Sequence, residues 1–290
     1  MRRFLLVTSI AVVLLVGMVG EAAAQDFVGG ARPVGMGGAF TSIGTGVDGI
    51  YHNPAGIATA RMYAFGGTYE YTPAGNILNG TIIDSKTNPR LAASAGYSYH
   101  IPHNKKTDPK GHDIRLALAV PALPNRVSVG LGGRYLVLKR DGAEFARGFT
   151  LDAGLLFQIV KTFHVGVTGQ NLIDICQQPA RCRGVAPLLV GVGASYGKTT
   201  PFRLASDFAL DITSEKEDLN FEIDVGAEYL AGGSFPVRLG YRHRTFDQSN
   251  HLTGGIGWRQ SRFGLDASAD FNLNEPEDIY ISASFSLYFN

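Results

Sequence analysis

The clearest pattern in the chain is a strict alternation of apolar and polar side chains from Ile279 to Phe289. The apolar positions are Ile279, Ile281, Ala283, Phe285, Leu287 and Phe289. Tyr280, Ser282, Ser284, Ser286 and Tyr288 lie between them. Since successive side chains of a strand point to opposite faces, this segment predicts a strand with one apolar face and one polar face. About 9–11 tilted residues of this kind cross a bilayer core, which favours an outer-membrane barrel over a soluble sheet.

Similar alternating segments, separated by turn residues, recur from Met62 onward. We predict about fourteen strands, an even number as in bacterial single-chain barrels. They are Met62–Thr72, Ile77–Asp84, Leu91–Ile101, Ile114–Pro121, Arg126–Leu138, Arg147–Val160, Phe163–Asn171, Leu188–Tyr196, Phe202–Ile212, Leu219–Leu230, Pro236–Thr245, Leu252–Gln260, Phe263–Leu273 and Ile279–Phe289. The last strand is expected to close the barrel against the first.

The lengths of the connections agree with this order, because outer-membrane barrels have short periplasmic turns and longer external loops. With the C-terminus in the periplasm, five tight turns are periplasmic: Pro124-Asn125, Lys161-Thr162, Lys198-Thr199, Gly232-Gly233 and Gln260-Ser261. The predicted external loops are longer: His103–Asp113, Lys139–Ala146, Asp174–Pro187 and Thr213–Asp218.

One hairpin can be placed in register if Gly232, Gly233 and Ser234 form a three-residue loop. The carboxylates of Glu222, Asp224 and Glu228 then face the guanidinium groups of Arg244, Arg242 and Arg238 respectively. Apolar side chains occupy the other face of both strands. Since Arg or Lys facing lipid at mid-bilayer costs about 2–4 kcal/mol, this charge ladder is expected to line the lumen.

Other polar positions are expected to face the same lumen: Arg134, Asp152, Gln158, Gln170, Arg203, Asp207, Asp211, Asp266 and Asp270. One interpretation is that these groups pair across neighbouring strands and stabilise the wall. The other is a polar pore lining that selects a solute. We favour the first, because paired charges cancel each other's field and leave little of it for a ligand.

The N-terminal region contains two further elements. Residues 1–24 resemble a secretory signal peptide, with Arg2-Arg3, an apolar run and Ala22-Ala23-Ala24 before the expected cleavage site. Residues 25–61 are rich in glycine and do not alternate, which predicts a compact irregular element. Residues 62–290 form the predicted barrel.

Composition and charge narrow the possible functions. The chain has 37 Gly, 17 Phe and 12 Tyr, 45% hydrophobic residues and a mean hydropathy of only +0.04, which suits strands with one polar face. A net charge of +1 without basic runs argues against nucleic acid as a partner. Cys176 and Cys182 lie close together in an expected surface loop, and in an exported chain they predict a disulfide rather than a metal site.

No sequence motif supports catalysis. There is no G-x-S-x-G elbow, and no Ser/His/Asp grouping stands out at a strand end. Gly35-Met36-Gly37-Gly38 contains a G-x-G element, but it lacks a preceding strand and a Walker lysine. We therefore predict a non-enzymatic protein that binds no cofactor and no metal.

The glycine-rich region resembles a known family. Its run from Gly30 to Thr41, which contains Gly35, Met36, Gly37, Gly38 and Phe40, is followed by Asp48 to Ile57, which contains Asn53, Pro54 and Gly56. Together these two runs resemble the start of the PorV/PorQ-like proteins of the FadL superfamily, which are outer-membrane barrels. The resemblance implies that residues 26–60 form a plug or hatch inside the barrel, and that Asn53-Pro54 makes a turn that packs it.

The resemblance also implies two competing roles. PorV-type members receive exported cargo proteins in type IX secretion, and we predict this role first because the Gly35-Met36-Gly37-Gly38 form looks more like PorV. FadL-type members carry hydrophobic small molecules across the outer membrane. A structural surface barrel without a transported ligand is a third possibility, and a soluble periplasmic β-protein is least favoured. The expected location is a Gram-negative-type outer membrane, with its lipid as a partner.

Overall fold

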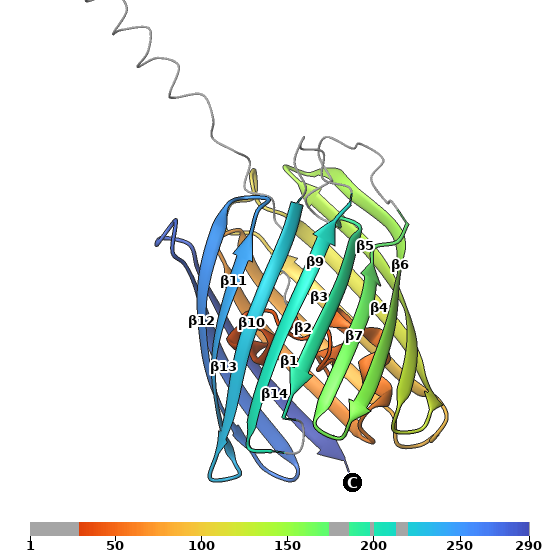
Figure 1. Cartoon of the computed structure of the whole chain (residues 1–290). Coiled ribbons are helices and arrows are strands. Elements are labelled where there is room, and N and C mark those ends of the chain that lie inside the picture. The colour runs from red at the N-terminus through yellow and green to blue at the C-terminus, as the bar shows by residue number, and fades with distance from the viewer. Residues whose placement is uncertain (1–28, 174–185, 198–199, 213–219, 290) are drawn as a thin grey trace, which may run out of the picture.

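The alternating segments form one closed antiparallel barrel (Figure 1) in a computed structural model that describes residues 29–173, 186–197, 200–212 and 220–289. Each strand pairs with its neighbours in sequence, and β14 closes on β1. Within the described residues the fourteen strands are β1 (Tyr63–Thr72), β2 (Gly75–Asp84), β3 (Ala92–Ile101), β4 (Lys110–Leu123), β5 (Val127–Arg140), β6 (Ala143–Val160), β7 (Phe163–Gln170), β8 (Leu189–Tyr196), β9 (Phe202–Asp211), β10 (Asn220–Ala231), β11 (Phe235–Arg244), β12 (Ser249–Arg259), β13 (Phe263–Asn272) and β14 (Ile279–Phe289).

The predicted barrel of fourteen strands is confirmed, including the seam. Tyr63 of β1 pairs with Phe289 of β14, and the last strand has the predicted bounds. The register of the β10–β11 hairpin also agrees with the prediction, with Glu228 opposite Arg238 and Asp224 opposite Arg242. The agreement follows from the period of two: a slip of one residue would turn every charge of the ladder toward the outside.

The two faces of the wall differ in polarity as the alternation predicts. On β11, Leu239 is 61% exposed and points outward, whereas Arg238 is only 3% exposed and points into the lumen. Other strands repeat this pattern, as with outward Leu131 on β5 and inward Asp113 on β4. The outside of the barrel is therefore an apolar surface around a charged interior.

Two predicted loops are wrong. Lys139–Ala146 is not a loop, because β5 and β6 extend to a tight turn at Asp141 and Gly142, both with positive φ. Asp-Gly is a strong signal for such a two-residue hairpin turn. His103–Asp113 is shorter than predicted, because Lys110 to Asp113 already pairs with β5. The extension of β4 (Lys110 to Asp113) and that of β5 (Lys139 and Arg140) lack large apolar side chains, and that of β6 (Ala143 to Ala146) does not alternate regularly, so the apolar alternation stops before the strands do.

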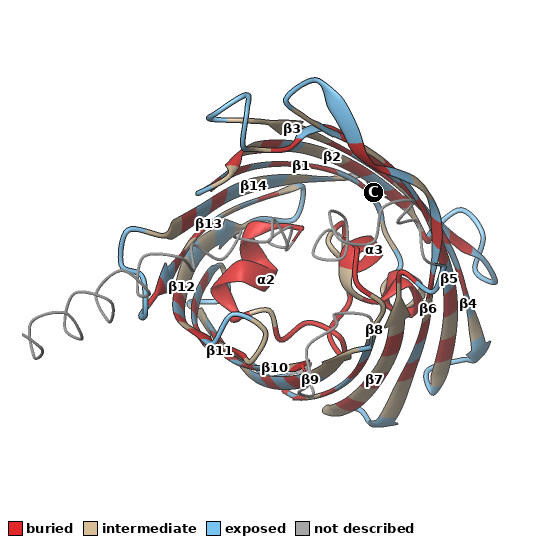
Figure 2. Ribbon diagram, turned by 90° about the horizontal axis from the view of Figure 1, so that it is seen from above, coloured by how far each residue is buried: buried red, intermediate tan, exposed pale blue. Residues whose placement is uncertain are grey.

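Residues 29–62, called the inner segment here, lie inside the barrel and not in its wall (Figure 2). They contain three short helices: α2 (Ala31–Gly35), α3 (Gly49–His52) and the 3₁₀ helix η1 (Pro54–Ala58). No helix among the described residues is long and apolar enough to cross a membrane. The predicted signal peptide and the Cys176–Cys182 disulfide lie outside the described residues, so both remain predictions.

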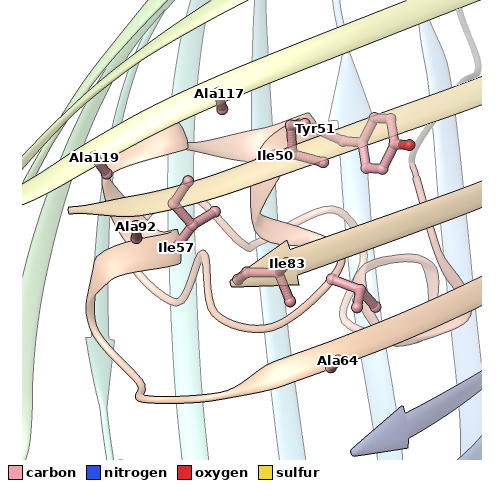
Figure 3. Close-up of a cluster of buried hydrophobic side chains, with 9 residues drawn as sticks. Ile50, Tyr51, Ile57, Ala64, Ile83, Ala92, Ala117 and Ala119 are labelled. Carbon is pink, nitrogen blue, oxygen red and sulfur yellow. The ribbon is translucent and has the colours of Figure 1, made fainter. Parts of the chain in front are cut away.

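The inner segment contributes one side of the largest apolar cluster (Figure 3). Val47, Ile50, Tyr51 and Ile57 pack against small or branched side chains of the wall, which are Ala64, Ile83, Ala92, Ala117 and Ala119. Alanines on the inward face of β1, β3 and β4 leave the space that the larger side chains of the inner segment fill. The core of this barrel is therefore shared between the wall and the inner segment.

Candidate functional site

The candidate site is the lumen with the inner segment inside it. The segment docks on pairs of glycines that lie opposite each other on neighbouring wall strands. Gly226 and Gly240 are paired across β10–β11, and a Cβ on either would overlap the backbone of Met36 or Gly37. The predicted motif Gly35-Met36-Gly37-Gly38 therefore makes backbone-to-backbone contact with the wall.

Two further glycine pairs serve the same purpose. Gly130 and Gly154 are paired across β5–β6, where added Cβ atoms would overlap Asn53, Pro54 and the Ala55 amide. In the third pair, across β7–β8, a Cβ on Gly166 would overlap the Thr41 carbonyl, and a Cβ on Gly193 would lie 3.0 Å from the Thr41 Cβ. We call these three pairs, Gly226–Gly240, Gly130–Gly154 and Gly166–Gly193, the wall glycine pairs. Each lies under a different part of the inner segment.

Asn53 fixes the second half of the inner segment. Its side chain is fully buried, accepts a hydrogen bond from the Ala55 amide at 3.0 Å and so begins η1. Its Nδ2 donates to the carbonyls of Thr41 at 2.9 Å and Leu155 at 3.1 Å. One amide therefore joins two parts of the inner segment to β6.

The other predicted motif residues are placed as follows. Gly35 packs on Gly255 of β12 and on the Arg238 side chain. Phe40 is fully buried, with its ring 5.2 Å from that of His52. Gly56 packs against Gly44 within the segment.

The largest ion-pair cluster among the described residues is centred on Glu228 of β10 and joins the inner segment to four strands, β9 to β12. Arg32 donates from Nε and Nη2 to the two carboxylate oxygens, at 2.9 and 2.8 Å. Arg238 of β11 and Arg203 of β9 donate at 2.8 and 3.1 Å, and Arg259 of β12 lies at 3.6 Å. These residues, Arg32, Arg203, Glu228, Arg238 and Arg259, form the Glu228 cluster.

A second cluster is centred on Arg242 of β11. Its guanidinium lies within 4 Å of the carboxylates of Glu222, Asp224 and Asp270, at 3.8, 3.5 and 3.8 Å. Its Nε also donates to the Gly37 carbonyl at 3.1 Å. The predicted charge ladder is thus brought together in the lumen, although Arg244 forms its ion pair with Asp247, at 3.1 Å, in the adjacent connection. What the ladder does in function remains a prediction.

Carboxylates of the wall also bind the backbone of the inner segment directly. Asp207 of β9 accepts hydrogen bonds from the amides of Phe40 and Thr41 at 2.8 and 2.6 Å. Glu70 of β1 accepts one from the Gly30 amide at 3.0 Å. Charge-assisted bonds of this kind are roughly twice as strong as neutral ones. The sequence predicted an inward position for Asp207 but not the contact of Glu70, because nothing in a strand pattern shows which amide lies opposite.

Asp48 is the single acidic residue of the inner segment, and it lies close enough to Arg32, Arg238 and Arg259 of the Glu228 cluster to interact with their charges. It precedes α3 and does not belong to a membrane-spanning strand. Burial, the largest effect, and the nearby carboxylate of Asp266 together raise its pKa to about 7, against the opposing effects of Arg32, Arg238 and Arg259. This side chain is therefore expected to change charge close to neutral pH.

The structure also brings together a serine, a histidine and an aspartate that sequence analysis did not find. His251 contacts Asp270 through Nδ1 at 2.7 Å and Ser249 Oγ through Nε2 at 3.0 Å. The Ser249 hydroxyl, however, donates to Asp247 at 2.6 Å, and Arg244 lies 3.2 Å from His251 Nε2. The Ser249 hydroxyl has a single proton and donates it to Asp247, so His251 cannot act as a base toward it. We therefore assign Ser249, His251 and Asp270 a structural role.

Within the described residues there is no group of three or more His, Cys, Asp or Glu that could hold a metal ion. Two of the cavities that the described residues form are large enough to hold a small molecule. One, of about 780 Å³, lies on the outside of the wall across β1, β2 and β12–β14. The other, of about 530 Å³, lies at the end of the barrel where the C-terminus is found.

No protein-family model matches the chain, and no curated protein matches it in sequence. Solved structures do match. The toluene transporter TbuX of Ralstonia pickettii has a TM-score of 0.65 at 12% identity, over 90% of this chain and 98% of its own. The CymD monoaromatic hydrocarbon channel has a TM-score of 0.67 at 14% identity, over 92% and 99%. A FadL homologue of Pseudomonas aeruginosa has a TM-score of 0.62 at 12% identity, over 90% and 98%. The chain therefore shares the barrel fold of these outer-membrane transporters and channels.

Proposed function

We propose that this protein is an outer-membrane channel that carries hydrophobic small molecules across the outer membrane. Three of its structural neighbours are a toluene transporter, a monoaromatic hydrocarbon channel and a FadL homologue. These neighbours support uptake of hydrophobic molecules, the second role that the sequence suggested, better than they support protein export. They are transporters and channels, which is compatible with the prediction of a non-enzyme.

The observation that carries this proposal is the apolar cavity of about 780 Å³ on the outer wall. It lies where the outward positions of three adjacent strands are small, at Gly67, Ala283 and Ala267. Large apolar side chains surround it, among them Tyr69, Leu78, Ile256, Trp258, Leu265 and Phe285. Its volume is within the range of about 300–1,000 Å³ that small-molecule sites occupy. Since most of the exposed lining is apolar, a hydrocarbon can pack against it.

In this conformation the wall is closed under the cavity. The pairing of β14 with β1 and with β13 continues past Ala283 without a register shift. The lumen is occupied by the inner segment, which is held by the wall glycine pairs and by the Glu228 cluster. Passage of a solute therefore requires the inner segment to move, the role of a plug that the family resemblance implies.

The orientation that we propose places the tight turns and the C-terminus in the periplasm. The alternative role is reception of exported cargo in type IX secretion, for which the Gly35-Met36-Gly37-Gly38 motif is one argument. The contacts of Gly37 and Gly38 with β10 and β11 account for those glycines by packing. The motif is therefore explained without cargo, and the PorV/PorQ resemblance adds no separate support for export.

The test is uptake of radiolabelled toluene by liposomes that contain the purified protein. We expect uptake several-fold above empty liposomes, and a several-fold loss in Ala283→Phe, which fills the outer cavity. Val192→Phe, an equally outward position on β8, is the matched control and is expected to transport normally. Uptake no faster than in empty liposomes would refute the transport role, whereas normal uptake by Ala283→Phe would refute only the part assigned to the cavity.

A further inference from the structure

The cavity at the C-terminal end of the barrel differs in character from the rest of the lumen. Its volume is about 530 Å³, and it lies between the end of the inner segment and the inward face of the wall. Thr59 and Arg61 come from the inner segment, Arg90 from the β2–β3 connection and Arg126 from the β4–β5 turn. Three arginines from three separate segments therefore line one cavity.

The charge around this cavity is not balanced. No Asp or Glu is among its lining residues. In the part of the chain that the structure describes, no ion pair joins Arg61, Arg90 or Arg126 to a carboxylate. The arginines of the Glu228 cluster, by contrast, all lie within 4 Å of that carboxylate.

Guanidinium groups without an ion-pair partner that line a common cavity favour an anionic ligand. Like charges repel, so placing them together is unfavourable unless an anion lies between them. A guanidinium donates in a planar fork that matches the two oxygens of a carboxylate or phosphate. The three side chains are exposed at the rim, so a ligand reaches them from solution.

The remaining lining is mixed, which indicates the rest of the ligand. Ser85, Ser128 and His164 are buried polar residues of the cavity. Apolar surface comes from Ala58, Pro89, Ala92, Pro121, Pro124 and Leu156. Sites with a largely apolar wall and a few convergent polar groups are typical of small organic ligands.

We propose that this cavity binds a small organic molecule that carries an oxyanion, a carboxylate or a phosphate, on a hydrocarbon body. The oxyanion lies among Arg61, Arg90 and Arg126, and the hydrocarbon body contacts the alanine, proline and leucine side chains. This binding is independent of the direction of transport and of the solute that crosses the lumen, so it stands whether or not toluene is carried.

The test is isothermal titration calorimetry on the full-length detergent-solubilised protein. The probes are benzoate, its neutral analogue benzamide, and inorganic phosphate. The variants are Arg126→Gln and the double variant Arg90→Gln/Arg126→Gln. Arg262→Gln is the matched control, because Arg262 is an exposed arginine in the β12–β13 turn at the same end of the barrel and outside the cavity. The heat-dependent gel shift in SDS verifies that each variant keeps its barrel.

We expect benzoate to bind at least tenfold more tightly than benzamide, since hydrogen bonds to charged groups contribute most of the difference. Benzoate binding is expected to weaken about tenfold in Arg126→Gln, more in the double variant, and not in Arg262→Gln. Phosphate binding as tight as that of benzoate, with the same response to the variants, supports the oxyanion site but refutes the hydrocarbon part. Equal binding of benzoate and benzamide, no binding of either, or equal weakening by Arg262→Gln overturns the proposal.

Discussion

Arg32 of the inner segment donates two hydrogen bonds to Glu228 of β10, although 196 residues separate them along the chain. Breaking this contact removes the bidentate link between the inner segment and the wall. In Arg32→Gln we expect the inner segment to dock less stably by about 1.5–3 kcal/mol, the usual contribution of hydrogen bonds to a charged group. Glu228 keeps Arg203 and Arg238 as partners, so the wall itself is expected to remain intact.

The measurement is single-channel conductance in planar bilayers, where Arg32→Gln is expected to open more often or to a higher level. Arg147→Gln is the control, because Arg147 pairs with Glu144 on the exposed surface at 3.4 Å. If the two variants have the same conductance as the wild type, the Glu228 contact does not hold the inner segment in place.

A single methyl group added at a wall glycine pair is expected to prevent normal docking of the inner segment. In Gly240→Ala the new Cβ meets the Gly37 amide, which is backbone and cannot rotate away. We expect the inner segment to be displaced and to become sensitive to added protease. Gly80→Ala on β2 is the control, because nothing lies within 4 Å of a Cβ there. Equal protease resistance of the two variants would contradict the docking role of the pair.

Asp48 predicts a pH dependence of docking. Its pKa in the folded protein is about 7, above the ordinary value of 3.8, so a bound proton favours the docked state. This contribution is complete below about pH 4 and is lost as the pH rises through 7. We expect channel openings to increase between pH 5 and pH 8. Asp48→Asn is expected to remove that rise, whereas Asp141→Asn, in the β5–β6 turn, is expected to keep it. A pH profile unchanged by Asp48→Asn would show that another group titrates.

On the outward face of the barrel, the loss of stability caused by an arginine substitution is expected to depend on its depth in the membrane. Leu239 lies in the middle of β11 and is 61% exposed, whereas Leu273 follows the end of β13. Leu239→Arg is expected to destabilise the barrel by about 2–4 kcal/mol, and Leu273→Arg by about 0–1 kcal/mol. Denaturant titration in lipid vesicles measures both. Equal effects would show that the hydrocarbon core is not centred on the middle of β11.

The sequence predicted the wall well because strand pairing has a period of two and local turns set the register. The Gly232-Gly233-Ser234 loop and the charges on either side of it were enough to place Glu228 opposite Arg238. The facing ends of β5 and β6 were missed because Lys139 and Arg140 are charged and residues 143–146 do not alternate regularly, although Asp141-Gly142 marks the turn.

The contacts between the inner segment and the wall could not be predicted in the same way. The sequence shows that Gly226 and Gly240 face each other, but it does not show that the backbone of Gly37 lies on them. Contacts of this kind join segments about 200 residues apart through backbone atoms, which carry no residue-type signal. Inward glycines on adjacent strands, opposite one another in a predicted register, are the signal that would have located them.

The wall glycine pairs also set an order of events in folding. Each pair exists only when its two strands are in the correct register, and the three pairs together involve β5–β6, β7–β8 and β10–β11. On a barrel with a slipped strand, a side chain would stand where the backbone of the inner segment has to lie. We therefore expect docking of residues 29–62 to be a late step, because only a correctly assembled wall leaves room for their backbone.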